Sequence, residues 1–179
     1  MTVRPIVALG NAVLRNKARK VTRFDASIRA LVRDMIETMR DAPGVGLAAP
    51  QIGVPLQVAV VEAEKDELYI LVNPEIIKSE GEHVLEEGCL SVPGYWGRVL
   101  RSEKVTVKAR DAHGKELRIS NAEGLLAQAL QHEIDHLQGT VYVDRLDSLD
   151  ELQRTPRRER RRTFEEAIDE NVEETHESA

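Results

Sequence analysis

The segment from 123 to 139, EGLLAQALQHEIDHLQG, constrains the fold of this chain more than any other. Projected as a helix at about 100° per residue, it forms two apolar-lined stripes and a polar side. The stripes hold Leu126, Leu130, Ile134 and Leu137, and Leu125, Ala129, His132 and His136, while the polar side holds Gln128, Gln131, Asp135 and Gln138. Because such a helix is apolar around most of its circumference, other elements must surround it. We therefore expect it at the centre of the fold.

The other elements are read from their periodicity and their turn residues. Residues 1–24 look irregular, and a helix begins at Asp25 or Ser27 and ends before Pro43. The glycine-rich stretch 44–53 reads as a loop with a short helical start. Runs rich in β-branched residues predict strands at 56–62, 68–74, 104–111 and 116–121, with a hairpin turn at 111–114 and a short strand at 141–146.

The order of these elements predicts the fold class. A helix, then strands, then a helix favours an α+β fold over alternating βαβ units. We expect mixed or antiparallel β-sheets packed around a central buried helix that carries the HExxH motif. An N-terminal helix and a C-terminal helix or tail complete the prediction. Residues 1–150 would form a single catalytic domain, and residues 151–179 a charged C-terminal helix or tail.

Charge and cysteine content narrow the class of protein. A net charge of -6 over 179 residues argues against nucleic-acid binding by the whole domain. The single cysteine rules out an internal disulfide and suits a reducing compartment. The first 21 residues contain neither a long apolar run nor a cleavage site for a signal peptidase. We expect a cytoplasmic protein, bacterial or organellar in type, with no membrane and no DNA partner.

The stretch QHEIDH, residues 131–136, carries the candidate chemistry. His132 and His136 lie four residues apart on one helical face, so both imidazoles can bind one ion. Glu133 sits beside them and can act as a general base toward water on that ion. The alternative is a pair of core histidines with Glu133 in a salt bridge, which has about even odds for an arbitrary HExxH match.

A catalytic metal site needs a third protein ligand, and two further segments offer functional residues. Cys89, in EEGCLSVPG, is the candidate ligand. It could instead be a buried apolar residue or a nucleophile with His132 as its base. In GVGLAAPQ, Gln51 follows a run of small residues and could present its amide N–H to an acyl oxygen.

Together these three segments resemble the signatures of the peptide deformylase family, GxGxAAxQ, EGCLS and QHExDH. They stand here as Gly44–Gln51, Glu87–Ser91 and Gln131–His136, in the same order and spacing, and the resemblance runs from about residue 5 to about residue 149. The stretch Gly10–Leu14 departs from the more usual Asp-Pro-x-Leu. The resemblance implies a metal-dependent hydrolase that removes the N-formyl group from the N-terminal formylmethionine of newly made polypeptides.

The resemblance also implies roles for particular residues. Cys89, His132 and His136 would bind one divalent ion, with water as the fourth ligand. Fe²⁺ is the usual ion in vivo, and Zn²⁺ or Ni²⁺ can occupy the site in a purified sample. Metal-bound hydroxide would attack the formyl carbon, with Glu133 as general acid and base. The Gln51 amide and the Leu90 backbone N–H would hold the oxyanion.

The substrate of such an enzyme would be the nascent formyl-Met polypeptide. The resemblance places its backbone along Val45 and Gly46 and its methionine side chain near Leu125 and Ala129. It also implies a salt bridge between Glu87 and Arg101 that braces the cysteine segment. The basic segment 154–162 could make a transient ribosome contact through RNA phosphates, although a charged solvated helix explains it as well.

Two rival functions use the same motif differently. A zincin-like metalloprotease would cleave internal peptide bonds and would need neither Cys89 nor Gln51. A module with a structural metal would need a fourth protein ligand, for which His83 and His113 are available.

Overall fold

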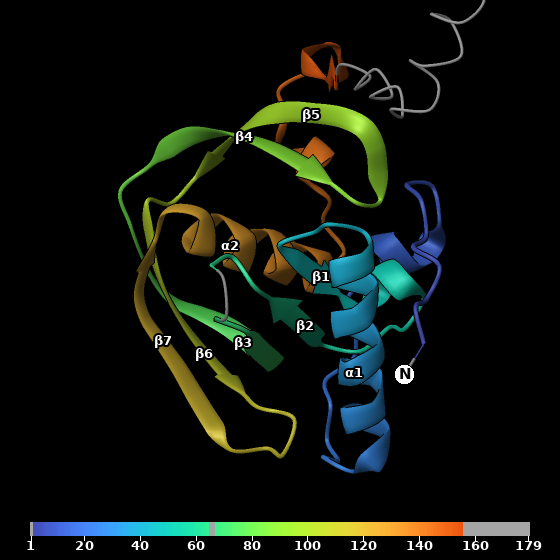
Figure 1. Ribbon diagram of the computed structural model, residues 1–179. Coiled ribbons are helices and arrows are strands. Elements are labelled where there is room, and N and C mark those ends of the chain that lie inside the picture. Colours follow the sequence, from blue (N-terminus) through green and yellow to red (C-terminus); the bar gives the residue numbers. More distant parts are fainter. Residues whose placement is uncertain (1, 65–66, 156–179) are drawn as a thin grey trace, which may run out of the picture.

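Two antiparallel sheets and two α-helices make up the fold of the computed structural model, which describes residues 2–64 and 67–155 (Figure 1). The helices are α1 (Ala26–Asp41) and α2 (Gly124–Gln138), and four short 3₁₀ helices are η1 (Ala12–Arg15), η2 (Ala49–Ile52), η3 (Tyr142–Arg145) and η4 (Leu149–Glu151). The strands are β1 (Gly46–Ala48), β2 (Val58–Val61), β3 (Tyr69–Glu80), β4 (His83–Cys89), β5 (Val92–Arg101), β6 (Lys104–Arg110), β7 (Glu116–Glu123) and β8 (Gln153–Arg154). The α+β class, the antiparallel sheets and the N-terminal helix are confirmed.

The larger sheet, with the order β1-β2-β3-β6-β7, separates the two α-helices. Successive side chains of a strand point to opposite faces. In β2, Val58 and Val60 pack in the cluster that contains α1, whereas Ala59 and Val61 pack in the cluster that contains α2. Because helices cover both faces, all four residues are buried, and β2 has no polar position.

Helix α2 lies between this sheet and the hairpin of β4 and β5 (Figure 1). Its apolar residues Ala127, Leu130 and Leu137 are almost fully buried against the larger sheet. On the other side, the amide of Gln128 donates to the backbone oxygen of Glu86 in β4 at 2.8 Å. The helix is therefore held on opposite sides by two sheets.

Local signals at two predicted boundaries agree with the structure. Asp25 is the N-cap of α1, and its carboxylate accepts from the Ser27 backbone N–H at 2.9 Å. The turn between β6 and β7 is closed by the backbone of Asp111, which donates to Lys115 at 2.9 Å and accepts from Gly114 at 3.0 Å. The predicted helix start and hairpin are both confirmed.

Two other predictions from local pattern differ from the structure. In the stretch 44–53 the short helical start is present as η2, but Gly46–Ala48 is not a loop, because it pairs with β2 as an edge strand. The segment 141–146 is not a strand but contains η3, where the Asp144 carboxylate accepts from the Val141 backbone N–H at 2.8 Å. That local bond favours a tight turn over an extended chain. The hairpin β4–β5 was not predicted at all.

Gly139 ends α2 and returns the chain toward η3. It has φ +82°, and a Cβ on it would lie 2.8 Å from the backbone oxygen of Arg15. Replacing Gly139 by alanine is therefore expected to lower the free energy of unfolding by about 1–3 kcal/mol, from both backbone strain and the clash. Chemical denaturation measures this loss.

The matched control is Gly53→Ala, because Gly53 has φ +79° but open space around its Cβ position. It carries the backbone strain without the clash, so it should lose less stability than Gly139→Ala. Equal losses at the two positions would contradict a steric contribution from Arg15.

The C-terminal predictions fall mostly outside the described residues. Strand β8 pairs with β5, but the rest of the predicted C-terminal helix or tail, residues 156–179, lies beyond them. The domain boundary at residue 150 stays a prediction, as does the ribosome contact of segment 154–162. Within residues 2–64 and 67–155, no helix is long and apolar enough to cross a membrane.

Candidate metal centre and active site

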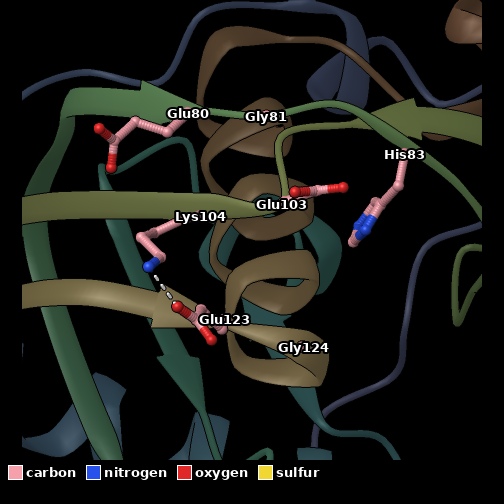
Figure 2. Close-up of a pocket in the computed structure, with 7 residues that line it drawn as sticks. All are labelled: Glu80, Gly81, His83, Glu103, Lys104, Glu123 and Gly124. Carbon is pink, nitrogen blue, oxygen red and sulfur yellow. Dashed lines mark ion pairs between the residues drawn. The ribbon is translucent and has the colours of Figure 1, made fainter.

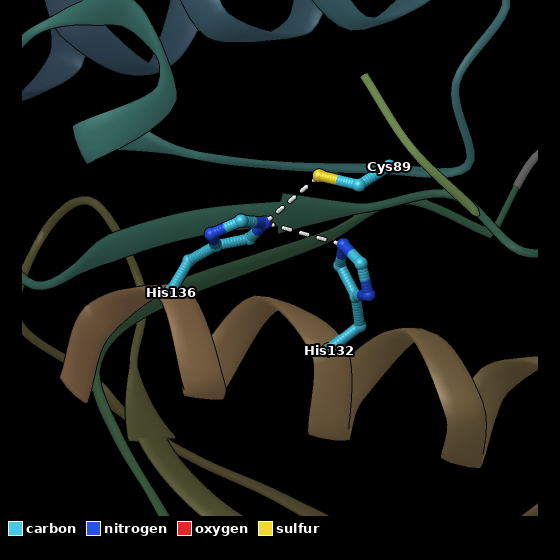
Figure 3. Close-up of side chains that lie close together, drawn as sticks. All are labelled: Cys89, His132 and His136. Carbon is cyan, nitrogen blue, oxygen red and sulfur yellow. Dashed lines mark hydrogen bonds between the residues drawn. The ribbon is translucent and has the colours of Figure 1, made fainter. Parts of the chain in front are cut away.

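Three donor side chains converge between α2 and β4. The Cys89 Sγ lies 3.2 Å from His136 Nε2, which lies 3.2 Å from His132 Nε2 (Figure 3). All three donor atoms fall within 4.8 Å of one another. One thiolate and two imidazoles at this spacing suit a single divalent transition-metal ion with an open fourth position. The donor set therefore fits the metal that the sequence predicted.

Local backbone structure brings these donors together. His132 and His136 rise from successive turns of α2, as their spacing predicted. Cys89 is the last residue of β4 and not part of a loop, and the pairing of β4 with β5 shifts between Gly88 and Cys89. An irregularity of this kind bends a strand and redirects a side chain. Here it accompanies the turn of the sulfur toward α2.

A buried ion pair fixes the orientation of the His132 ring. The His132 Nδ1 lies 2.5 Å from Glu87 Oε1, and Arg101 donates to both Glu87 oxygens at 2.6 and 2.9 Å. Burial opposes the charged form of Glu87, but the bonds from His132 and Arg101 outweigh it and lower its pKa to about 2. The predicted Glu87–Arg101 salt bridge is present, and it leaves His132 Nε2 facing Cys89 and His136.

The second imidazole lies in a fully buried position. His136 is 0% exposed, and burial, reinforced by the neighbouring His132, lowers its pKa to about 3. Its ring is therefore neutral at physiological pH. A neutral imidazole is the form that binds a metal ion.

Glu133 is a buried carboxyl group that follows His132 in the sequence and lines the same cleft as His132 and Cys89. It is 3% exposed, its Oε2 has no hydrogen-bond partner among the described residues, and burial raises its pKa to about 7. A Cβ on Gly46 would overlap Glu133 Oε1, so only glycine lets β1 pass this close to the carboxylate. An unpaired carboxyl with a pKa near neutrality can both accept and donate a proton.

The Gln51 amide faces the same centre. Its Oε1 accepts from the Ala48 backbone N–H at 2.8 Å, which turns Nε2 toward Cys89 Sγ and Ser91 Oγ, each 3.4 Å away. The contact to the Ser91 oxygen is long for an amide donor, and sulfur is a weak acceptor. The N–H groups of the Gln51 amide are thus fixed in direction but only weakly hydrogen-bonded, so they can bind a substrate oxygen.

A cleft of about 640 Å³ opens beside these groups. It is lined by every residue that the sequence placed in the site except His136, namely Val45, Gly46, Gln51, Cys89, Leu90, Leu125, Ala129, His132 and Glu133. Two of them, Val45 and Leu125, are 41% and 47% exposed. Tyr95 and Thr155 also line the cleft and were not predicted, because the pairing of β5 with β8 that places them there has no local signal.

A second hollow of about 440 Å³ lies at the opposite end of β4 from Cys89. Figure 2 shows its lining by the acidic residues Glu80, Glu103 and Glu123, with His83 at one side. His113 lies in the turn between β6 and β7. Among the described residues, only three donors form the metal-binding group, so neither histidine supplies the fourth ligand of a closed structural site.

The chain matches a known protein family over most of its length. The sequence model of the family described as polypeptide deformylase matches residues 3–152. The chain belongs to this family. Peptide deformylases are metal-dependent hydrolases that remove the N-formyl group from newly made polypeptides, so this chain is an enzyme of protein biosynthesis that acts on formyl-Met substrates.

Individual deformylases are similar in sequence and in structure. A peptide deformylase of Dehalococcoides mccartyi is 52% identical over 153 residues, which cover 85% of this chain and 91% of that protein. The crystal structure of a peptide deformylase from Legionella pneumophila has a TM-score of 0.81 at 52% identity and covers 84% of this chain and 89% of its own. A deformylase from Synechococcus elongatus, in complex with actinonin, has a TM-score of 0.78 at 41% identity, with 82% and 80% coverage.

Proposed function

We propose that Cys89, His132 and His136 hold one divalent cation and that deformylation takes place beside it, with Glu133 transferring the protons. The convergence of the three donor atoms within 4.8 Å, next to a buried carboxyl group, carries this proposal. The donor set suits Fe²⁺, Zn²⁺ and Ni²⁺ alike, and the family resemblance favours Fe²⁺. A bound cation would act as a Lewis acid and lower the pKa of a water molecule to near 7.

Glu133 is the group that moves protons. Burial holds its pKa near 7, so its two protonation states are close in free energy at physiological pH. It accepts a proton from the attacking water and later delivers it to the departing amine. The unpaired Oε2 supports this role, because no donor among the described residues competes for the oxygen.

The Gln51 amide and the Leu90 backbone N–H stabilise the oxyanion that forms on the formyl group. The bond from Ala48 N–H already orients the Gln51 amide, so little reorganisation is needed when charge develops. Leu90 follows Cys89 directly and lines the same cleft. Both donors therefore lie at the side of the cleft that carries the metal ligands.

Replacing Gln51 by leucine is expected to lower kcat by about 10²–10³-fold with a small change in KM, because the amide acts on the transition state. Steady-state kinetics on a formyl-Met peptide, with the metal content of each sample, measures this. The control is Gln57→Leu, at a buried glutamine whose amide donates to the Ala18 backbone oxygen at 3.1 Å. It should lose stability but keep kcat; a Gln51→Leu enzyme within threefold of wild-type kcat would contradict the role.

The peptide lies along β1. This strand is at the edge of the larger sheet, and Gly46 and the preceding Val45 line the cleft. An extended peptide can add to such an edge through backbone hydrogen bonds, which tolerates many sequences. The methionine side chain packs near Leu125 and Ala129 of α2, which line the cleft together with the ring of His132.

Formate release tests the proposed function against the protease alternative. The metal-loaded protein is incubated with three peptides of one sequence that begin with formyl-Met, acetyl-Met and free Met. We expect formate from the first, little acetate from the second, and no internal cleavage in any. Internal cleavage without formate release would favour a zincin-like protease, and acetyl removal at the formyl rate would contradict a site that fits only the small formyl group.

A further inference from the structure

We propose that Asp135 and Arg145 are positioning residues for His132, and that they act on it through Arg101 and Glu87. The inference rests on the proposed metal site and adds to it two residues outside the donor group and the cleft lining. The sequence placed Asp135 on the polar side of α2 and gave Arg145 no role. The structure joins them in one continuous chain of contacts.

The contacts run from the imidazole to the surface. Arg101, which holds Glu87 with two bonds, donates a third from Nη1 to Asp135 Oδ2 at 2.7 Å. Arg145 then donates to both oxygens of Asp135, from Nε at 2.6 Å and from Nη2 at 2.5 Å. Each guanidinium thus binds a carboxylate with two prongs, a geometry that restricts rotation of both partners.

The burial of these groups explains why the outer pair matters. The side chains of Arg101 and Glu87 are 2% and 4% exposed, whereas those of Asp135 and Arg145 are 13% and 41% exposed. A buried guanidinium requires partners for its donors, and Glu87 occupies one edge of Arg101. Asp135 accepts the hydrogen bond from Arg101 Nη1, so two carboxylates fix the orientation of the Arg101 guanidinium.

Charge balance explains the need for a second arginine. Two carboxylates alternate with two guanidiniums, so the four side chains together are neutral. Without Arg145, Asp135 would carry a negative charge with Arg101 as its sole cationic partner in the network. Arg101 would then be drawn toward Asp135 and away from Glu87, and the imidazole held by Glu87 would lose its fixed orientation.

The turn at the end of α2 brings Arg145 close to Asp135. Asp135 lies three residues after His132 on α2, and its backbone oxygen accepts from Thr140 N–H at 3.0 Å, just past the turn at Gly139. The chain then enters η3, whose last residue is Arg145. The return of η3 along the end of α2 therefore delivers the Arg145 side chain to Asp135.

Outer partners of metal-binding histidines typically change metal affinity by about 10–100-fold. Because Arg145 acts through three other side chains, we expect Arg145→Ala to weaken Co²⁺ binding by about tenfold, at the low end of that range. Chelator competition measures the affinity, and the visible absorption of the Co²⁺ protein reports ligand geometry. The ligand-field bands should shift or broaden. Arg145→Lys keeps the charge but not the two-pronged contact, so it should recover part of the affinity.

The matched control is Arg15→Ala. Arg15 is 43% exposed and forms its ion pair with Asp144 of the same η3, which is outside the network. It should keep wild-type Co²⁺ affinity and spectrum, while thermal unfolding of both metal-free variants reports any general loosening of η3.

Wild-type affinity and spectrum in Arg145→Ala would overturn the inference, as would equal losses of affinity in Arg15→Ala and Arg145→Ala. In both cases the proposed function would still stand, provided that the wild-type protein binds Co²⁺ and releases formate. A wild-type protein that binds no metal would instead overturn the proposed function and this inference together.

Discussion

Replacing Glu133 by glutamine is expected to lower kcat/KM on a formyl-Met peptide by about 10²–10⁴-fold, the usual contribution of a positioned acid–base group. Glutamine has nearly the same shape and keeps the contact with Gly46, but it cannot accept and release the proton. The fold should survive, because the change removes a buried ionisable group whose Oε2 has no partner among the described residues. Kinetics and metal content are measured on the same sample.

Glu75→Gln is the control for Glu133, since it makes the same change at an exposed position of β3 away from the cleft. It should leave kcat/KM unchanged. If Glu133→Gln binds metal normally and turns over within tenfold of wild type, another group must move the proton.

The second large effect is expected from Cys89→Ala. It removes one of three donors, so metal affinity should fall by more than the roughly 10–100-fold that loss of an outer partner costs. Activity should fall in proportion to metal occupancy. Metal titration followed by the formate assay measures both, and a large excess of metal should restore only part of the activity.

His83→Ala is the control for Cys89, because His83 lies at the second hollow and outside the donor group. Its variant should bind metal as wild type does. If Cys89→Ala binds one ion with wild-type affinity, the thiolate is not a ligand of the metal. If His83→Ala loses metal binding, His83 is a fourth protein ligand and the site is a closed structural one.

The site was largely predictable because its residues lie in three short segments. Helical spacing alone placed His132 and His136 on one face of α2, and the run of small residues before Gln51 indicated that its amide could meet an acyl oxygen. The position of Cys89 relative to the helix was implied by the family resemblance and not by spacing. Nothing local in the sequence relates residue 89 to residues 132–136.

The elements that were missed depend on pairing between distant residues. Strand β5 contains Pro93, Gly94 and Gly97, which read as turn signals, yet it pairs with β4 along most of its length. In contrast, the stretch 141–146 begins with the β-prone residues Val-Tyr-Val, but the carboxylate of Asp144 accepts a hydrogen bond from the backbone N–H three residues earlier. Side-chain bonds of this kind override the β propensity of a short run.

The contact between Asp135 and Arg145 had no signal that could have been read in advance. Arg145 is ten residues further along the chain, across a helix end whose direction depends on the left-handed conformation of Gly139. Helical projection assigns Asp135 to the polar side correctly, but it says nothing of which cation lies there. Structure was needed to connect the surface arginine to the imidazole.

X-ray absorption at the metal edge of the loaded protein tests the central claim most directly, because it counts the ligand atoms of the bound ion. We predict one sulfur at about 2.3 Å and two imidazole nitrogens at about 2.0–2.1 Å, typical of Zn²⁺ sites, with one further light atom from solvent. A spectrum without sulfur, or with a third imidazole in its place, would contradict the centre built from Cys89, His132 and His136.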